Sequence, residues 1–173
     1  MKPISFLAAC LVALLMSACA STGGSSSSAA GDTYFEVHRD GRIHVFYDAK
    51  TFQDYLRVGE TAFRITRIGA GPQGETLVFG LAEADRIKTR GLAGPDIWDG
   101  KKKPGKALYA EFRRDNDIYV LSNYADIVAL RQGQTPANTQ SQPASGPNGE
   151  NLFYATDSAD QLMQLFAGYH TAP

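Results

Sequence analysis

The segment Tyr34–Asp40 reads YFEVHRD, and the segment Tyr109–Asp115, at a shift of 75 residues, reads YAEFRRD. A second pair keeps the same shift, since Gly71–Leu77 reads GPQGETL and Gly146–Leu152 reads GPNGENL. Similarity at one fixed spacing is typical of a structural unit that is used twice. The sequence therefore predicts two copies of one unit, which are repeat 1 at residues 34–91 and repeat 2 at residues 107–168, joined by a connector at residues 92–106.

Each unit is predicted to begin with a β-hairpin. Aromatic and branched residues flank Asp40-Gly41, a pair that favours a two-residue turn because both positions take left-handed backbone. Asp115-Asn116 meets the same demand in repeat 2. In this register Val37 faces His44, and Glu36 and His38 lie on the other face of the sheet.

A helix at residues 49–58, capped by Asp48 and ended by Gly59, follows the first hairpin. Strands at residues 62–68 and 75–81 and a short helix at residues 84–90 complete the unit. In repeat 2 the positions that match the third strand, residues 137–143, read ANTQSQP, which lacks an apolar face and ends in proline. We therefore expect a loop there. The predicted fold is α+β, with a mainly antiparallel sheet of about seven strands and helices on one face.

The first residues have the composition of a secretory signal. Lys2 supplies a positive charge, residues 4–16 are mostly apolar, and small residues follow. The apolar run is shorter than the roughly 20 residues that a membrane-spanning helix needs.

The segment Leu15–Cys19 reads LMSAC and resembles the lipobox of bacterial lipoproteins, although Met16 stands where leucine is usual. The resemblance implies a signal peptide at residues 1–18, acylation of Cys19, and anchoring to the periplasmic side of the outer membrane. Anchoring in the inner membrane and release into the periplasm are the alternatives. Leu7–Cys10 also fits the motif, but it leaves a shorter apolar core before the cut. Residues 19–33 are rich in serine and glycine and read as a flexible tether.

The remaining residues, 34–173, are predicted to form one domain. Their paired hairpins and Gly-Pro-x-Gly-Glu turns resemble an uncharacterised group of bacterial secreted lipoproteins with the same duplicated arrangement, and this resemblance implies no activity. Removal of Cys10 and acylation of Cys19 would leave no thiol for a disulfide or for catalysis. The formal net charge of −1 argues against general nucleic-acid binding, which favours a strongly basic face.

The connector holds the residues that best suit a binding surface. Lys101, Lys102 and Lys103 form the main run of like charge, and Trp98, the single tryptophan, lies beside it. Such a run could contact anionic lipid headgroups or a cell-wall polymer, or it could be a solvated loop. Trp98 is expected to be buried and to pin the connector to the core, whereas an exposed Trp98 would suit an anionic or sugar partner.

No residue pattern indicates a cofactor or a nucleophile paired with a base, and no metal site is predicted. His38 and His44 are expected on opposite faces, and His170 lies near the carboxyl end. The sequence thus favours a membrane-tethered envelope lipoprotein with a non-enzymatic binding or structural role. The alternative is a periplasmic enzyme, such as a hydrolase, with a carboxylate site between the repeats that would use Glu36, Glu75, Glu111 or Glu150. Assembly through an exposed strand edge is a third possibility.

Overall fold

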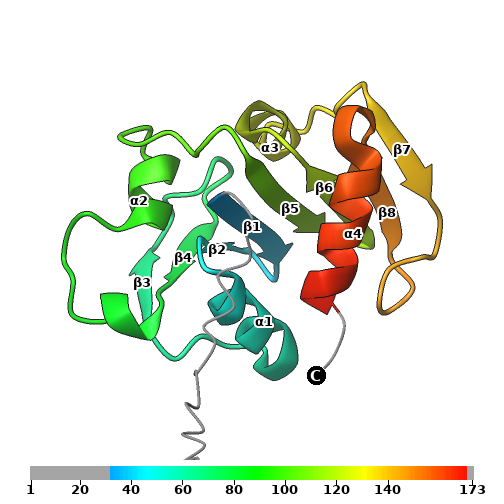
Figure 1. Cartoon of the computed structure of the whole chain (residues 1–173). Coiled ribbons are helices and arrows are strands. Elements are labelled where there is room, and N and C mark those ends of the chain that lie inside the picture. Colours follow the sequence, from blue (N-terminus) through cyan, green and yellow to red (C-terminus); the bar gives the residue numbers. More distant parts are fainter. Residues whose placement is uncertain (1–31, 171–173) are drawn as a thin grey trace, which may run out of the picture.

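The computed structural model of the protein describes residues 32–170, so the predicted signal peptide, Cys19 and most of the tether lie outside the described residues. Within this range the chain forms one eight-stranded sheet and four α-helices (Figure 1). The strands lie in the order β3-β4-β2-β1-β5-β6-β8-β7. Their bounds are β1 (Asp32–Arg39), β2 (Arg42–Phe46), β3 (Arg64–Arg67), β4 (Thr76–Gly80), β5 (Leu108–Arg114), β6 (Asp117–Leu121), β7 (Thr139–Gln142) and β8 (Asn151–Ala155). The helices are α1 (Ala49–Val58), α2 (Ala93–Trp98), α3 (Tyr124–Arg131) and α4 (Ala159–His170).

The sheet is mixed, which corrects the prediction of a mainly antiparallel sheet. β1–β2, β3–β4, β5–β6 and β7–β8 are antiparallel, whereas β2–β4, β6–β8 and the central pair β1–β5 are parallel. The connections through α1 and α3 carry the chain past one strand position, so that β4 and β8 run parallel to β2 and β6. The third strand of each half then forms an outer edge.

The hairpin prediction is confirmed. Val37 lies opposite His44 and Phe35 opposite Phe46, so Glu36 points to the face opposite to His44. The turn residues Asp40 and Gly41 have φ values of 53° and 69°, which is the left-handed backbone that this turn demands.

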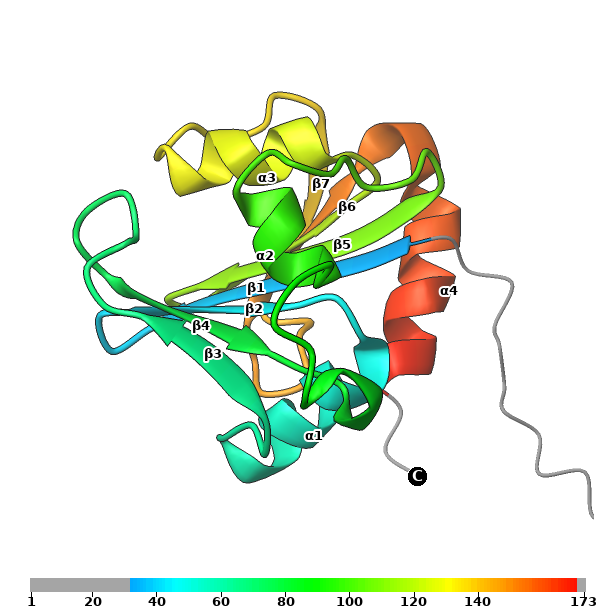
Figure 2. The same cartoon turned by 90° about the vertical axis from the view of Figure 1, so that its left-hand side faces the viewer.

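Helices cover both faces of the sheet, and the prediction of helices on one face is wrong. α1 and α4 share one face, where the Phe35 ring stacks on Phe52 at 4.0 Å. α2 and α3 share the other face (Figure 2). There the Tyr34 ring meets Tyr124 edge-on at 5.1 Å. Four consecutive residues of β1, residues 34–37, are buried. A strand buried on both sides needs a layer of side chains above and below it.

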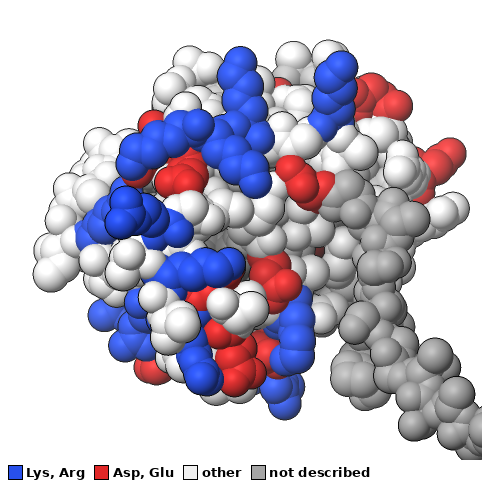
Figure 3. Space-filling model, turned by 60° about the vertical axis from the view of Figure 1, so that its left-hand side comes forward, with Lys and Arg blue, Asp and Glu red and all other residues white. Residues whose placement is uncertain are grey.

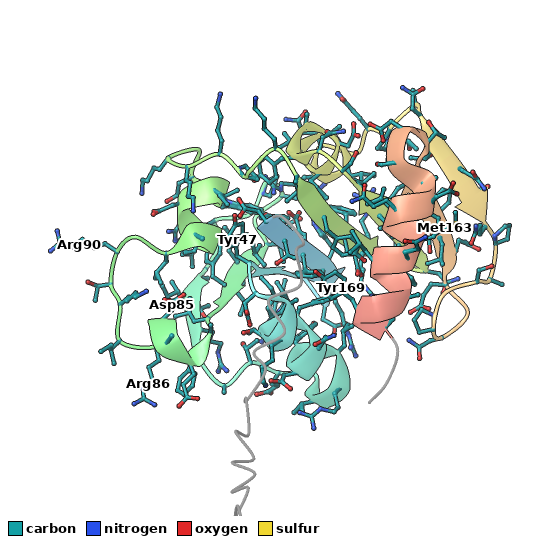
Figure 4. The ribbon with its side chains drawn as sticks, viewed as in Figure 1. Tyr47, Asp85, Arg86, Arg90, Met163 and Tyr169 are labelled. Atoms are coloured by element: carbon teal, nitrogen blue, oxygen red, sulfur yellow. The ribbon has the colours of Figure 1, made fainter. Side chains whose placement is uncertain are left out.

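Residues 139–142 form strand β7, which corrects the expectation of a loop in repeat 2. β7 is an edge strand that pairs only with β8, and its two middle residues are exposed, so it needs no apolar face. Pro143 follows the strand and removes no ladder hydrogen bond. Gln142 Nε2 donates to Met163 Sδ of α4 at 3.3 Å, which ties this edge to a helix. Met163 lies on the side of α4 toward β8 (Figure 4).

The connector is more regular than its sequence suggests. It contains α2, whereas the helix expected at residues 84–90 is reduced to a 3-10 turn, η1 (Glu83–Asp85). A second such turn, η2 (Thr156–Ser158), leads into α4.

Helix α1 begins at the Asp48 cap and ends at Gly59, as predicted, because the Asp48 side chain accepts from Thr51 N and Gly59 takes a φ of 85°.

Gly80 provides a test of this packing. A Cβ added at Gly80 would lie 2.5 Å from the ring of Phe46, which is fully buried against α1. We expect Gly80→Ala to lower the free energy of unfolding by about 1–3 kcal/mol, because the core is already full. Urea denaturation measures this change.

Gly168→Ala is the matched control, because a Cβ at that position of α4 meets open space. It should raise stability by about 0.5–1 kcal/mol through helix propensity. An unchanged free energy of unfolding for Gly80→Ala would contradict the packing described here.

Candidate functional site

The repeated Gly-Pro segments are structural turns, and their glutamates serve the turns themselves. Gly74 N donates to Gly71 O at 3.1 Å, and the matching bond in the second half, from Gly149 N to Gly146 O, is 3.0 Å long. The carboxylate of Glu75 accepts from a turn amide, Gln73 N, at 2.7 Å. The carboxylate of Glu150 accepts from Asn148 N, also at 2.7 Å.

Glu36 is fully buried in the face that α2 and α3 cover. Arg131, the last residue of α3, donates from Nη2 to Glu36 Oε2 at 2.6 Å and from Nε to Oε1 at 3.1 Å. Tyr34 Oη donates to Oε2 at 3.1 Å, and His38 Nε2 lies 2.7 Å from Oε1. One carboxylate thereby joins strand β1 of the first half to helix α3 of the second.

Glu111 is fully buried in the face that α1 and α4 cover. Arg113 donates to its Oε2 from Nε at 3.2 Å and from Nη2 at 3.1 Å. Tyr109 Oη donates to Oε1 at 2.6 Å, and His170 Nε2, from the end of α4, lies 2.8 Å from the same oxygen. This carboxylate therefore joins strand β5 to helix α4.

The four glutamates of the alternative enzyme site do not form one cluster, although Arg113 contacts both Glu111, at 3.1 Å, and Glu150, at 4.0 Å. Glu36 aligns with Phe112 on one face of the β1–β5 pair, and Glu111 aligns with Phe35 on the other. Glu75 and Glu150 lie in turns of different halves. The structure thus brings Tyr, Glu, Arg and His together twice, but it separates the two sets by the thickness of the sheet.

Both clusters are buried ion pairs, and this setting determines the pKa of each glutamate. Burial alone would raise the pKa of Glu36, but hydrogen bonds from His38 and Arg131 outweigh it and hold the pKa below the ordinary value. Burial opposes ionisation of Glu111 in the same way, and His170 and Arg113 bring its pKa below the ordinary value. Both carboxylates are therefore ionised at neutral pH.

Each buried carboxylate already accepts two contacts per oxygen, which is the full capacity of the group. A general acid or base needs a reacting atom within hydrogen-bond reach. Neither Glu36 nor Glu111 is exposed to solvent. The two clusters therefore suit fixation of α3 and α4 on the sheet. Arg131 and His170 complete these clusters, and no sequence pattern connected either residue with a glutamate.

His38 and His44 lie on opposite faces of the sheet, as the hairpin register predicts. His38 belongs to the Glu36 cluster, His170 to the Glu111 cluster, and His44 stacks near Tyr55 on the face opposite to His38. Within residues 32–170 no group of three or more His, Cys, Asp or Glu side chains could hold a metal ion.

Trp98, which was expected to be buried, is half-buried and packs against the core. Its ring lies edge-on to Phe79 at 6.2 Å, and the guanidinium of Arg131 sits 3.7 Å from the ring centroid. This cation–π contact extends the Glu36 cluster to α2. Trp98 therefore contributes mainly to packing.

The lysines after α2 are exposed at the surface. Lys101 pairs with Asp99 at 2.9 Å, and the ammonium of Lys102 lies 5.5 Å from the centre of the Tyr47 ring. Lys103 and Lys106 are also exposed. Basic side chains gather along the upper edge of the molecule in the space-filling view, with acidic ones between them (Figure 3).

The lysine loop lies beside the start of β1. Gly105 N donates to the Asp32 carboxylate at 2.6 Å, so the loop that carries the lysines is tied to the first described residue of the chain. β1 then runs for eight residues, about 26 Å, to the hairpin turn at the opposite end of the sheet. The lysine loop and the hairpin turns thus lie at opposite ends of the molecule (Figure 2).

A strand-end hollow of about 500 Å³ opens where the parallel strands β1 and β5 end. Its lining contains both arginine and carboxylate side chains, and Arg113 Nη1 lies 4.0 Å from Glu150 Oε1. Arginine and carboxylate side chains in this hollow therefore neutralise one another in part.

A basic hollow of about 490 Å³ lies next to it, between the end of α1 and the sheet face formed by β2, β4 and β3. The residues that matter for its chemistry are Arg39, Arg42, His44, Arg64, Thr66 and Thr76. Burial and then the charges of Arg42, Arg39 and Arg64 lower the pKa of His44 below its ordinary value. No motif in the sequence singles out these arginines.

Comparison with known proteins finds no matching protein-family model, no matching curated protein and no matching solved structure. In residues 32–170 no helix is long and apolar enough to cross a bilayer.

The Glu36 cluster predicts a pH-dependent stability. Glu36→Gln leaves Arg131 buried without its counter-charge, so we expect a loss of about 3–5 kcal/mol in the free energy of unfolding at pH 7. Because the pKa of Glu36 in the folded protein is below the ordinary 4.5, its contribution is present above pH 4.5 and is lost as the pH falls through the lower value. Urea denaturation across this range should show the difference between wild type and variant shrinking toward acid.

Glu83→Gln is the control, because Glu83 is an exposed glutamate that pairs with Arg86 on η1. It should change the free energy of unfolding by less than about 0.5 kcal/mol. A Glu36→Gln variant as stable as wild type at pH 7 would refute the account of the buried cluster.

Proposed function

We propose that this protein is an envelope lipoprotein, anchored by acyl chains on Cys19, whose globular part has a non-enzymatic binding role. The observation that carries the proposal is the run of lipobox residues Leu15–Cys19 followed at once by a Ser- and Gly-rich tether. Acylation by more than one chain gives stable anchoring, whereas a single chain gives marginal binding. We place the anchor on the periplasmic side of the outer membrane.

The geometry of the described residues supports an orientation in which the start of β1 and the lysine loop face the membrane. A tether of about a dozen residues has a typical reach of about 20 Å, and it joins the sheet at Asp32. The exposed lysines lie on the loop that is hydrogen-bonded to Asp32, where the chain arrives from the anchor. Positive side chains near a surface of anionic lipid are attracted by about 1 kcal/mol each. The two hollows at the far end of β1 would then face away from the membrane.

Among residues 32–170, the four glutamates of the alternative enzyme site serve the structure itself, which favours binding over hydrolysis in this proposal. Glu36 and Glu111 are enclosed and fully hydrogen-bonded, and Glu75 and Glu150 hold turns. The accessible features in residues 32–170 are instead charged surfaces, which suit recognition of an envelope partner or ligand.

We propose further that the two halves arose by duplication of one β-β-α-β-β-α unit. Support comes from the constant shift of 75 residues, from left-handed Asp40 and Asp115 in the two hairpin turns, and from the equivalent caps Asp48 and Asn123. Homologues whose two halves lack these matching caps and turns would count against the duplication.

Cys19→Ser tests the anchor. Cells labelled with radioactive palmitate should incorporate label into the wild-type protein but not into Cys19→Ser, because only the Cys19 thiol is acylated in this proposal. Cys10→Ser is the matched control, since Cys10 lies within the removed signal, and this variant should keep the label. An unlabelled wild-type protein, or loss of label in Cys10→Ser, would refute anchoring at Cys19.

A further inference from the structure

The basic hollow has an open floor formed by one side of the sheet. Arg42 and His44 of β2 follow the same face as Phe46, and Thr76 and Val78 of β4 lie opposite them in parallel register. Arg64 and Thr66 continue this face on β3. α1 covers the inner part of the face, and its Tyr55 and Gly59 form one wall of the hollow. Arg42, Arg64 and Thr66 are exposed, so their side chains are accessible from solvent.

The positive charges of this hollow are only partly compensated. Arg39 pairs with its neighbour Asp40 at 3.0 Å, whereas Arg64 donates to a backbone oxygen, Thr61 O, at 3.2 Å. Arg42 forms no ion pair among the described residues. Glu60 is the other carboxylate of the lining, so three arginines face two acidic side chains. Arg42 and Arg64, the two guanidinium groups without a carboxylate partner, line the same hollow from β2 and β3, on either side of β4.

The second half of the chain provides an internal comparison. At a shift of 75 residues, Asp117 stands at the position of Arg42, Tyr119 at that of His44, and Thr139 at that of Arg64. Asp117 accepts a hydrogen bond from Asn151 at 2.9 Å, and the Tyr119 ring stacks on Phe153 at 4.6 Å. The corresponding sheet positions of the second half thus hold an acidic, an aromatic and a hydroxyl side chain, so this strand arrangement does not by itself require arginines there.

We propose that the basic hollow is a binding site for a small ligand that carries an oxyanion group, a phosphate or a carboxylate. Guanidinium groups present paired N–H donors that match the oxygens of both groups. Thr66 and Thr76 add hydroxyl donors on the same floor, and Tyr55 and Val78 add apolar surface for the rest of the ligand. The volume of about 490 Å³ lies within the usual range for small-molecule sites. Binding in this hollow is independent of anchoring at Cys19, because the hollow is lined by residues of the described sheet, of α1 and of the turns next to them.

Titration calorimetry of the full-length protein at low ionic strength tests the proposal, with inorganic phosphate and citrate as the probes. Wild type should bind at least one of them, and the ratio of the two dissociation constants identifies which oxyanion the site prefers. The double variant Arg42→Gln/Arg64→Gln should weaken binding by more than about tenfold, because two charge-assisted donors are removed. Arg42→Asp/Arg64→Thr, which copies the residues of the second half, should abolish it.

Arg57→Gln is the matched control, since Arg57 is an exposed arginine on α1 that pairs with Asp54 and lies outside both hollows. Its affinity for either probe should equal that of wild type. Thermal unfolding of each variant checks that the fold is intact, as expected for exposed positions. The proposal is overturned if wild type binds neither probe, if Arg42→Gln/Arg64→Gln binds as tightly as wild type, or if Arg57→Gln weakens binding to the same extent. None of these results bears on palmitate labelling at Cys19.

Discussion

The parallel pairing of β1 with β5 is the contact on which the rest of the structure depends. It joins a four-stranded half to a second four-stranded half, and it buries both central strands on two sides. Each half alone would leave this edge unpaired and its central strand half-covered. The helices of the two halves therefore alternate between the faces, with α1 beside α4 and α2 beside α3.

Burial on both faces explains the two polar clusters in the middle of the sheet. A carboxylate in a central strand must find charged partners, because an isolated buried charge is costly. Glu36 takes histidine from its own strand and arginine from helix α3, whereas Glu111 takes arginine from its own strand and histidine from helix α4. Each cluster thus pairs a glutamate with one arginine and one histidine, but the residue that the helix supplies is arginine in one cluster and histidine in the other. In both cases the result is a helix fixed at one position on the sheet.

Local signals in the sequence predicted local structure well. The turn at Asp40-Gly41, the Asp48 cap and the register of Val37 against His44 follow from two to four neighbouring residues, and the structure confirms each. The faces chosen by the helices and the parallel central pair depend on contacts between halves, which periodicity does not report. Residues 34–37 are buried without a break, as in a strand covered on both faces, whereas the one-sided sheet expected from the sequence implied alternating burial. Strand β7 was missed because an edge strand needs little apolar surface.

The arginines of the basic hollow come from β1, β2 and β3, and only the pairing of β2 with β4 and of β4 with β3 brings them together.

The central claim is that the two halves form one cooperative unit through β1 and β5. Native-state hydrogen exchange with increasing denaturant tests it most directly, because it reports the opening free energy of each strand separately. The account predicts that amides of β1 and β5 exchange only with global unfolding, and that the inner strands β2 and β6 lose protection at the same denaturant concentration. Exchange of β5 and β6 at a lower concentration, while β1 and β2 remain protected, would contradict the claim.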